Sequence, residues 1–370
     1  MKKKEMVKVA IVKCKTYKQE EVDKAIKTLL GLAEIQLPKG KKVLIKPNIV
    51  GSFKKKQEAT TTHPSLIEAI CKILKANNCK IYIGESSFMD TSCAFRDSGI
   101  EKVSKKYGTL IIFEQDKLTK IKDAKAKVLK NFYLSKTLKN VDLIINFPKL
   151  KTHQLTKYTG AIKNLYGCIP GGMKQKLHLK AGTTTKFSKL LVDIYQNLKP
   201  EINIMDGVVG MEGKGPTSGN PKKAGYLLAS KNAVSLDVVS SKLMGYNPKT
   251  IPTIKEAIKR KLGTFKFVLV GMAKLPNLHF KKPSVTEELS KNILKRFRQK
   301  PIIVDENKCI KCGLCARKCP AKAIKLNPFP EINKKKCIRC FCCMEICPQH
   351  ALSLKESKKK RKRKKRNNFK

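Results

Sequence analysis

Eight cysteines near the end of the chain fall into two runs of identical spacing. Both runs have the form C-x2-C-x2-C-x3-C-P, and their cysteines are Cys309, Cys312, Cys315 and Cys319, then Cys337, Cys340, Cys343 and Cys347. Thiolates are soft ligands that suit iron-sulfur clusters, and the short spacing lets one tight loop direct three sulfur atoms at one cluster. The pattern predicts two [4Fe-4S] clusters, and it constrains the fold of this region more than any other feature of the chain.

In this type of double run, the fourth cysteine of each run binds the cluster of the other run. The first predicted ligand set is therefore Cys309, Cys312, Cys315 and Cys347. The second predicted set is Cys337, Cys340, Cys343 and Cys319. Zinc is the alternative, but zinc sites built on C-x2-C usually use two separated pairs for each metal. The extra Cys342 breaks no spacing, and we interpret it as a bystander thiol, with ligand exchange under oxidation as the alternative.

We expect residues 301–355 to form a small α+β domain of the ferredoxin type with two clusters and an internal pseudo-twofold repeat. The predicted function is electron relay to or from a site in the rest of the chain or a partner protein, because two neighbouring clusters suit conduction whereas a structural role needs only one. Basic residues around the cysteine loops predict an acidic redox partner. These residues are Lys311, Arg317, Lys318, Lys334, Lys335, Lys336 and Arg339.

The chain has a net charge of +53 over 370 residues, and this excess is spread along its length, mostly as solvated lysine. Residues 358–366 differ in kind, because they are nine consecutive basic residues. Such a block repels itself, so we expect residues 356–370 to form a disordered polybasic tail. Its charge would allow binding to nucleic acid, anionic lipid or an acidic protein. Only Phe369 lies nearby for base stacking, which favours a solvated tail over a dedicated nucleic-acid arm.

Cysteine usage and hydropathy bear on the compartment. The cysteines outside the two runs are scattered singly, which is typical of proteins in a reducing environment. No segment approaches the roughly 18 uninterrupted apolar residues of a membrane span. The apolar stretch at residues 7–12 is short and interrupted by Lys8, unlike the core of a signal peptide. We expect a cytoplasmic protein that does not span a membrane.

Upstream of the cysteines, strand-like and helix-like segments alternate. The predicted strands are residues 7–12, 43–45, 80–83, 109–113, 141–146, 202–205 and 266–270. The predicted helices are residues 20–34, 64–77, 187–197, 233–244 and 253–261. Alternation of this kind predicts an α/β body with a mostly parallel sheet over residues 1–273, and a Lys- and Pro-bearing linker at 274–300.

Several motifs in the body occur in a combination that resembles a known family. They are Lys46-Pro47-Asn48, Thr60 to Pro64, Gly84-Glu85-Ser86, Asn146 to His153, Thr159 to Gly167 and Asp206 to Gly219. This set resembles the uncharacterised domain-of-unknown-function family 362, which is often joined to a two-cluster ferredoxin module. The resemblance covers roughly residues 7–270, and it implies no particular reaction because none is established for the family.

The segment from Lys149 to His178 holds the candidate catalytic residues of the body, His153, Lys163 and His178. Apolar residues at helical spacing predict a helix over residues 155–165, which would place Lys163 beside the core. A partly desolvated lysine can lose its proton near neutral pH, and neighbouring imidazoles can move protons to or from a substrate. The alternative is that these groups bind an anionic ligand or satisfy buried carbonyls.

The order and separation of His153, Lys163 and His178 are also similar to the His, Lys, His series of nickel-pincer lactate racemases. That resemblance implies a lysine that anchors the cofactor and a histidine that binds nickel. Nickel is therefore one hypothesis for the body, and an anionic ligand is the other. The candidate ligand-binding residues are Lys149, Lys151, Asp206, Gly213 and Gly215.

Both glycines lie in a Gly- and Pro-rich segment, residues 210–219, that follows a predicted strand, where α/β proteins often contact ligands. Three function classes remain open for the chain. The favoured class is an oxidoreductase or its electron-transfer subunit. The alternatives are a non-redox, isomerase-like enzyme that uses His153, Lys163 and His178 beside regulatory clusters, and a cluster protein associated with nucleic acid.

Overall fold

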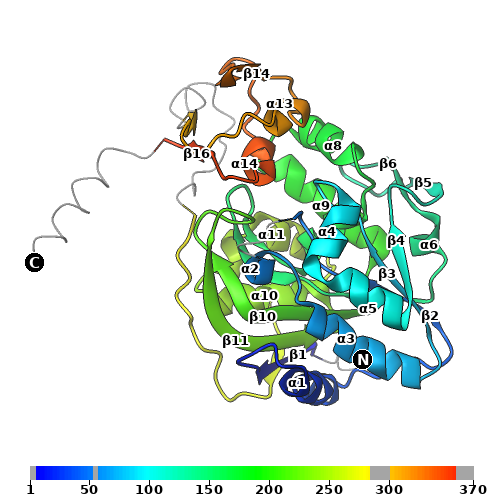
Figure 1. The fold of residues 1–370 in the computed structure, drawn as a ribbon. Helices are drawn as coiled ribbons and strands as arrows, with labels where there is room; N and C mark the ends of the chain where they lie inside the picture. Colours follow the sequence, from blue (N-terminus) through cyan, green and yellow to red (C-terminus); the bar gives the residue numbers. More distant parts are fainter. Residues whose placement is uncertain (1–5, 53–56, 284–300, 356–370) are drawn as a thin grey trace, which may run out of the picture. The chain divides into compact units, whose positions relative to one another are not determined.

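The protein is described by a computed structural model that covers residues 6–52, 57–283 and 301–355. The chain divides into two compact units, Met1–Thr286 and Glu287–Lys370 (Figure 1). The predicted disordered tail at 356–370 lies outside the described residues. Within the described ranges, no helix is both long enough and apolar enough to span a bilayer.

A single large sheet forms the centre of the first unit, the body. Its strands follow the order β12 (Val268–Val270), β1 (Lys8–Lys13), β11 (Asn220–Ser230), β10 (Ile202–Glu212), β7 (Leu143–Asn146), β2 (Lys42–Lys46), β3 (Lys80–Glu85) and β4 (Thr109–Ile112). A further strand, β8 (Lys149–His153), pairs with β10 and with β9 (Lys157–Thr159). Pairings are parallel except those of β11 with its two neighbours and that of β8 with β9. The predicted α/β body with a mostly parallel sheet is confirmed.

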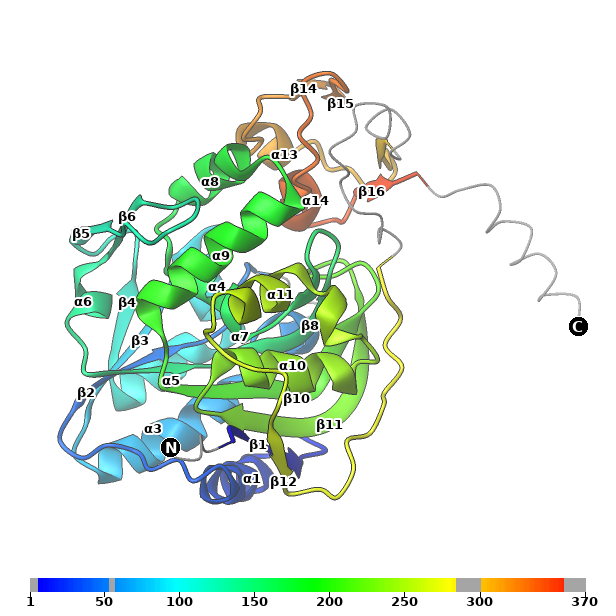
Figure 2. The same cartoon turned by 180° about the vertical axis from the view of Figure 1, so that it is seen from behind.

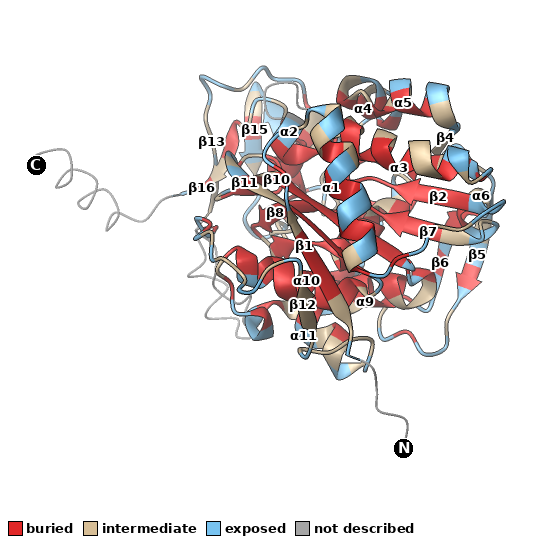
Figure 3. Ribbon diagram, turned by 90° about the horizontal axis from the view of Figure 1, so that it is seen from below, coloured by how far each residue is buried: buried red, intermediate tan, exposed pale blue. Residues whose placement is uncertain are grey.

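Helices cover both faces of this sheet (Figures 1 and 2). One face carries α1 (Gln19–Leu32), α3 (Pro64–Ala76), α4 (Thr91–Ser98) and α5 (Ile100–Tyr107). The other carries α7 (Ala161–Asn164), α9 (Thr184–Leu198), α10 (Ala233–Leu243) and α11 (Pro252–Lys259). Successive strand residues point to opposite faces, so Leu44 of β2 enters one apolar core while Val43 and Ile45 enter the other. The strands are accordingly buried along most of their length (Figure 3).

The region around the predicted 155–165 helix folds differently from the sequence-based expectation. Residues 157–159 form strand β9, and α7 begins only at Ala161. The buried carboxylate of Asp237 accepts hydrogen bonds from the N–H groups of Ala161 at 2.6 Å and Ile162 at 3.1 Å, which fixes the start of the helix. A β-carbon on Gly160 would lie 2.1 Å from Asp237 Oδ1, so only glycine allows this approach. The predicted helix was wrong because a distant carboxylate caps the chain at this point.

The segment 210–219 is also more regular than predicted. Strand β10 continues to Glu212, and β11 returns from Asn220, so the connecting loop is confined to residues 213–219. Residues 278–280, in the predicted linker, pack on the body: the Leu278 N–H donates to the Leu243 carbonyl at 2.8 Å, and the Phe280 N–H donates to the Met244 carbonyl at 3.1 Å. Residues 284–300 lie outside the described residues.

The second unit is a small α+β structure, as predicted. It contains the antiparallel pairs β13 (Ile302–Val304) with β16 (Leu352–Leu354) and β14 (Ile324–Asn327) with β15 (Phe329–Ile332). Each cysteine run contributes one short helix, α13 (Leu314–Arg317) or α14 (Cys342–Ile346).

The two cysteine runs of this unit share their backbone conformation. Equivalent residues adopt positive φ angles, with 55° at both Lys311 and Arg339, 71° at Gly313 and 64° at Phe341. The repeat seen in the sequence is therefore present in the backbone of the second unit.

Candidate functional site

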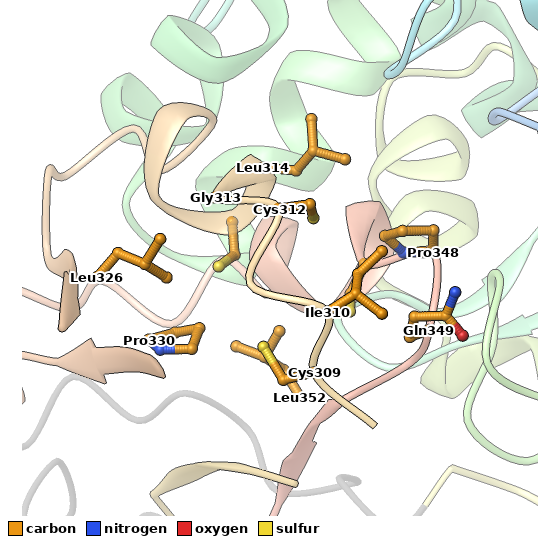
Figure 4. A pocket seen from close by; sticks show the side chains of 12 residues that line it. Cys309, Ile310, Cys312, Gly313, Leu314, Leu326, Pro330, Pro348, Gln349 and Leu352 are labelled. Carbon is orange, nitrogen blue, oxygen red and sulfur yellow. The ribbon is translucent and has the colours of Figure 1, made fainter. Parts of the chain in front are cut away.

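Four cysteines line one cavity in the second unit (Figure 4). They are Cys309, Cys312 and Cys315 of the first run and Cys347 of the second. The remaining lining of this cavity is mainly apolar, including Ile310, Leu326 and Leu352. Burial, reinforced by the neighbouring thiols of Cys347, Cys312 and Cys309, raises the pKa of Cys315. A thiol donor set in an apolar cavity fits an iron-sulfur cluster, whose positive irons favour the deprotonated sulfurs.

The other four cysteines of the runs influence one another in the same way. Burial raises the pKa of Cys343 well above its usual range, and the strongest contributing thiols are Cys340, Cys337 and Cys319. The pKa of Cys337 is raised by burial, with Cys340 and Cys319 adding to the shift. Cys319 of the first run thus groups electrostatically with three cysteines of the second.

Backbone N–H groups point at the last sulfur of each run. The Ala323 N–H donates to Cys319 Sγ, and the Ala351 N–H donates to Cys347 Sγ, both at 3.3 Å. Such bonds stabilise a thiolate and influence the reduction potential of a bound cluster. In the described residues, no three His, Cys, Asp or Glu side chains converge on a site for a single metal ion. A cubane makes no such demand, since each thiolate binds a different iron.

Cys342, interpreted from the sequence as a bystander, is fully buried and contacts a cysteine of the run. A hydrogen bond with the Cys342 side chain is the main cause that lowers the pKa of Cys340. The pKa of Cys342 itself is held well above its usual range by the same hydrogen bond and by burial. Cys342 therefore contacts one predicted cluster ligand, Cys340, through a hydrogen bond between the two side chains.

In the body, polar residues gather where the chain changes direction across the sheet. Strands β2 and β7 are adjacent, but the chain leaves β2 towards β3 and β4, whereas β10 lies on the other side of β7. Ligands of open α/β sheets bind outside the carboxyl ends of the strands at such a switch point. Lys46 ends β2, Glu85 ends β3 and Asn146 ends β7, so all three lie at this edge.

A buried hydrogen-bonded network connects these strand ends. Lys46 Nζ lies 2.6 Å from Glu85 Oε2, and both side chains are almost completely excluded from solvent. Asn164 accepts from Asn48 Nδ2 at 2.8 Å and donates to Asn146 Oδ1 at 2.7 Å. Burial raises the pKa of Glu85, although Lys46 and Lys174 oppose the shift.

Close packing at this network requires a glycine on the neighbouring chain. A β-carbon on Gly167 would lie 1.9 Å from Glu85 Oε1 and 2.7 Å from Lys46 Nζ. Only a residue without a side chain can pass this close to the buried ion pair.

A second buried ion pair joins β8 to β10. Lys149 Nζ donates to Asp206 Oδ2 and to the Tyr17 hydroxyl, each at 2.7 Å. The Tyr17 ring stacks on His63 with centroids 3.8 Å apart. Burial lowers the pKa of Lys149, with Asp206 opposing the shift. Desolvation also lowers the pKa of His63 to about 4, so this imidazole is neutral at pH 7.

Two further lysines are buried at the same edge. Lys151 Nζ donates to Asn48 Oδ1 at 2.7 Å and to the Thr60 carbonyl at 2.8 Å. Lys174 Nζ donates to Ser86 Oγ at 3.0 Å, and burial lowers its pKa to about 8. Glu85 and Asp206 offset the charges of Lys46 and Lys149, so the positive charge that favours an anion comes from Lys151 and Lys174.

The three candidate catalytic residues come from separate elements and influence one another. His153 ends β8, Lys163 lies on α7, and His178 lies on α8 (Met173–Ala181). Desolvation is the main cause that lowers the pKa of His153 well below its usual range, and Lys163 and His178 are the next contributors. The pKa of His178 falls to about 3, first through burial and then through Lys163. Both imidazoles are therefore neutral at pH 7.

Contacts fix the orientation of both rings. His153 Nδ1 accepts hydrogen bonds from the N–H groups of Leu155 at 3.0 Å and Thr156 at 3.2 Å, which places the ring proton on Nε2. His178 stacks on Phe187 with centroids 4.4 Å apart. The three candidate residues are thus two buried, neutral imidazoles and one half-buried lysine.

The predicted ligand-binding residues fall into two places. Lys149 and Lys151 lie on β8, which ends with the candidate catalytic residue His153. Asp206 lies opposite Lys149 on the neighbouring strand β10. Gly213 and Gly215 lie in the loop between β10 and β11, which is tied to β8 because Thr152 Oγ1 donates to the Gly213 carbonyl at 3.1 Å. A β-carbon on Gly215 would lie 2.1 Å from the Thr152 carbonyl oxygen, so a packing contact explains this glycine.

The predicted site lacked Lys46, Glu85, Lys174 and Tyr17, which the structure adds to the same region. Lys46 and Glu85 follow the predicted strands 43–45 and 80–83 and occur in the family motifs, which is a usable signal. Lys174 and Tyr17 carry no comparable signal, because their partners are distant in the chain. Nothing in the residues alone pairs Tyr17 with Lys149.

Comparison with known proteins agrees with both parts of the chain. The model of the family described as "Domain of unknown function (DUF362)" matches residues 43–242, and that of the "4Fe-4S binding domain" matches residues 302–325. One relative is the thylakoid-associated protein sll1697 of Synechocystis sp. The two sequences are 29% identical over an alignment of 322 residues, and the match covers 80% of this chain and 98% of the relative.

Two solved structures are more distant. A Thermotoga maritima protein shares 14% identity at a TM-score of 0.37, over 54% of this chain and 52% of that protein. The lactate racemase apoprotein of Thermoanaerobacterium thermosaccharolyticum also shares 14% identity at a TM-score of 0.37, over 56% of this chain and 51% of the racemase. The chain thus spans about half the length of these two structures. On the sequence matches, the chain is an iron-sulfur protein that belongs to the DUF362 family.

Proposed function

We propose that residues 301–355 bind two [4Fe-4S] clusters and relay electrons between an external carrier and either the body or a partner protein. In this proposal Cys309, Cys312, Cys315 and Cys347 hold one cluster. Cys319, Cys337, Cys340 and Cys343 hold the other. A linker before residue 301 joins this domain to the body.

The observation that carries the proposal is the cavity lined by Cys309, Cys312, Cys315 and Cys347. Cys347 belongs to the second run, so its presence beside three cysteines of the first supports an exchange of fourth ligands. The electrostatic grouping of Cys319 with Cys337, Cys340 and Cys343 supports the reciprocal exchange. Two clusters in one small domain suit electron conduction, since each accepts one electron.

Paired substitutions test the exchange of ligands. Under the proposal, Cys309 and Cys347 serve one cluster, so the double variant Cys309→Ser/Cys347→Ser should lose one cluster and retain about four of about eight irons. Cys337 and Cys347 serve different clusters, so Cys337→Ser/Cys347→Ser should damage both. Iron and sulfide content after anaerobic purification, with electron paramagnetic resonance during reduction, measures the outcome.

The control is Cys342→Ser. Cys342 lies on α14 beside Cys343, and the proposal leaves it outside both ligand sets. This variant should retain about eight irons. If Cys337→Ser/Cys347→Ser kept one intact cluster while Cys309→Ser/Cys347→Ser lost both, the ligands would not be exchanged. Stoichiometric zinc without sulfide would remove the electron-relay proposal altogether.

A second candidate function resides in the body. We propose that His153, Lys163 and His178 act as an acid-base group of a non-redox, isomerase-like enzyme, with the clusters in a regulatory role. The favouring observation is that three separate elements bring these groups within electrostatic range of one another. His153 carries its proton on Nε2 and can donate a hydrogen bond to a substrate, Lys163 can exchange a proton with the substrate, and the surplus of buried lysines favours an anionic substrate. Nickel remains a hypothesis for the same residues.

Substitution of Lys163 tests this candidate. Lys163→Met should abolish any interconversion of single enantiomers of small chiral carboxylates, measured by chiral chromatography. It should also raise the pKa of His178 as measured by NMR, because one neighbouring positive charge is gone. Lys180→Met, an exposed change on the same helix as His178, is the control and should alter neither quantity. Unchanged activity and an unchanged pKa of His178 in Lys163→Met would rule out the role. Metal analysis of the same preparations tests for nickel.

A further inference from the structure

The second unit presents large apolar side chains to solvent beside the cysteine cavity. Ile310 is 60% exposed and Leu326 is 41% exposed, and both line the cavity (Figure 4). Cys312, which also lines it, is exposed, whereas Cys315 and Cys347 are buried. Exposed apolar surface that is rimmed by polar side chains is a feature of protein–protein contact sites.

Basic side chains border these apolar residues. Lys311 Nζ lies 4.8 Å from the centre of the Phe329 ring, which places its charge over the hairpin that carries Leu326. A β-carbon on Gly313 would lie 2.8 Å from Arg317 Nη1 and 3.8 Å from Leu326 Cδ2, so Arg317 and Leu326 flank the same glycine. We refer to Ile310, Leu326, Lys311 and Arg317 as the Ile310 face.

We propose that the Ile310 face docks an acidic electron-carrier protein. This inference rests on the proposed electron relay and specifies its partner and place of contact. Transient redox complexes use small interfaces, in which an apolar centre excludes water and a charged border steers the encounter. The border here is positive, so the partner must be acidic. Neither the lysine-rich body nor a second copy of this chain, which carries a net charge of +53, has the complementary charge.

The internal repeat shows that this face is specific to the first run. The residues equivalent to Ile310 and Lys311 are Ile338 and Arg339, and both are only partly exposed, whereas Ile310 and Lys311 are exposed. The first loop therefore offers both an exposed apolar centre and an exposed positive charge to a docking carrier. The repeat also supplies a matched comparison. Lys336 is an exposed lysine directly before the second run, and it belongs to the basic residues from which the sequence predicts an acidic partner. The present proposal places it outside the contact, so it tests whether the first loop alone docks the carrier.

Binding of a strongly acidic flavodoxin to the full-length, cluster-loaded chain tests the proposal. Calorimetry at several ionic strengths should show binding that weakens steeply with salt. Lys311→Glu and Ile310→Asp should each weaken binding about tenfold at low salt, and Lys336→Glu less than about twofold. In Lys311→Glu, electron transfer from the reduced flavodoxin should slow in parallel, while reduction by dithionite, which needs no docking surface, should be unchanged.

Three results would overturn the inference. They are no measurable binding, equal weakening by Lys336→Glu and Lys311→Glu, and binding that survives both face variants but disappears when residues 356–370 are removed. Iron content and the spin signal are recorded for each preparation. A chain that carries both clusters yet does not bind the flavodoxin contradicts only the docking face, whereas a chain without clusters contradicts the electron relay itself.

Discussion

At the scale of single residues, the surroundings of the buried histidines in the body determine their protonation state. His178 is stacked on Phe187, edge-on to Tyr166, and its pKa falls to about 3 because burial disfavours the imidazolium. His153 is held neutral for the same reason, with Lys163 adding to the effect. Both histidines were predicted as site residues, but their neutrality follows from neighbours that the sequence does not place beside them.

Buried neutral histidines predict that the body is sensitive to acid. Between the unfolded pKa of about 6.5 and the folded pKa of about 3, the unfolded chain binds a proton that folded His178 does not. The contribution to stability is full above pH 6.5 and is lost as the pH falls. From pH 7 to pH 5 each such histidine should cost about 2 kcal/mol of the free energy of unfolding.

Replacement of His178 tests this dependence. His178→Phe should reduce the loss of stability between pH 7 and pH 5 by about 2 kcal/mol, measured by urea unfolding followed by circular dichroism. His279→Phe, at an exposed histidine, should leave the loss as it is in the wild type. An equal pH dependence in wild type and His178→Phe would show that His178 is not buried in the neutral form.

At the scale of elements, hydrophobic patterning located the seven predicted strands and five helices, α1, α3, α9, α10 and α11, but it missed α4, α5 and α8. It missed β8, because Lys149 and Lys151 in an otherwise short segment suggest a solvated loop. These two lysines can be buried only because Asp206, Asn48 and Thr60, which are distant in the chain, accept hydrogen bonds from their ammonium groups. It missed β11 because the strand starts with Asn220, Pro221 and two lysines.

The two candidate sites differ in how much of their geometry is specified by the sequence. The cysteine runs carry their own geometry in their spacing, so grouping them required no tertiary information. The trio of His153, Lys163 and His178 was singled out from a shorter pattern, and its members do influence one another. The pairing of Lys46 with Glu85, and of Lys174 with Ser86, depends on how parallel strands align at one edge of the sheet. Periodicity within a segment contains no such information.

At the scale of the whole molecule, the two units are stabilised by different interactions. The body has two extensive apolar cores, one on each face of its sheet. The second unit has short strands and helices and few large buried side chains, and several of its buried residues are the cysteines themselves. A core this small supplies little folding free energy, and small domains often add a metal or disulfides to it. Bound clusters would therefore supply much of the second unit's folding free energy.

This difference predicts that removal of the clusters unfolds one unit and spares the other. Oxidation with ferricyanide in the presence of a chelator strips iron from [4Fe-4S] proteins, and hydrogen exchange followed by mass spectrometry then reports on each segment. Amides of residues 301–355 should lose protection, because the sulfur sets no longer close the loops on a common centre. Amides of β2 and β7, in the middle of the large sheet, should exchange as slowly as in the loaded chain. Persistent protection of 301–355 would mean that its small core is sufficient without iron, and loss of protection in β2 would mean that the body depends on the clusters for its stability.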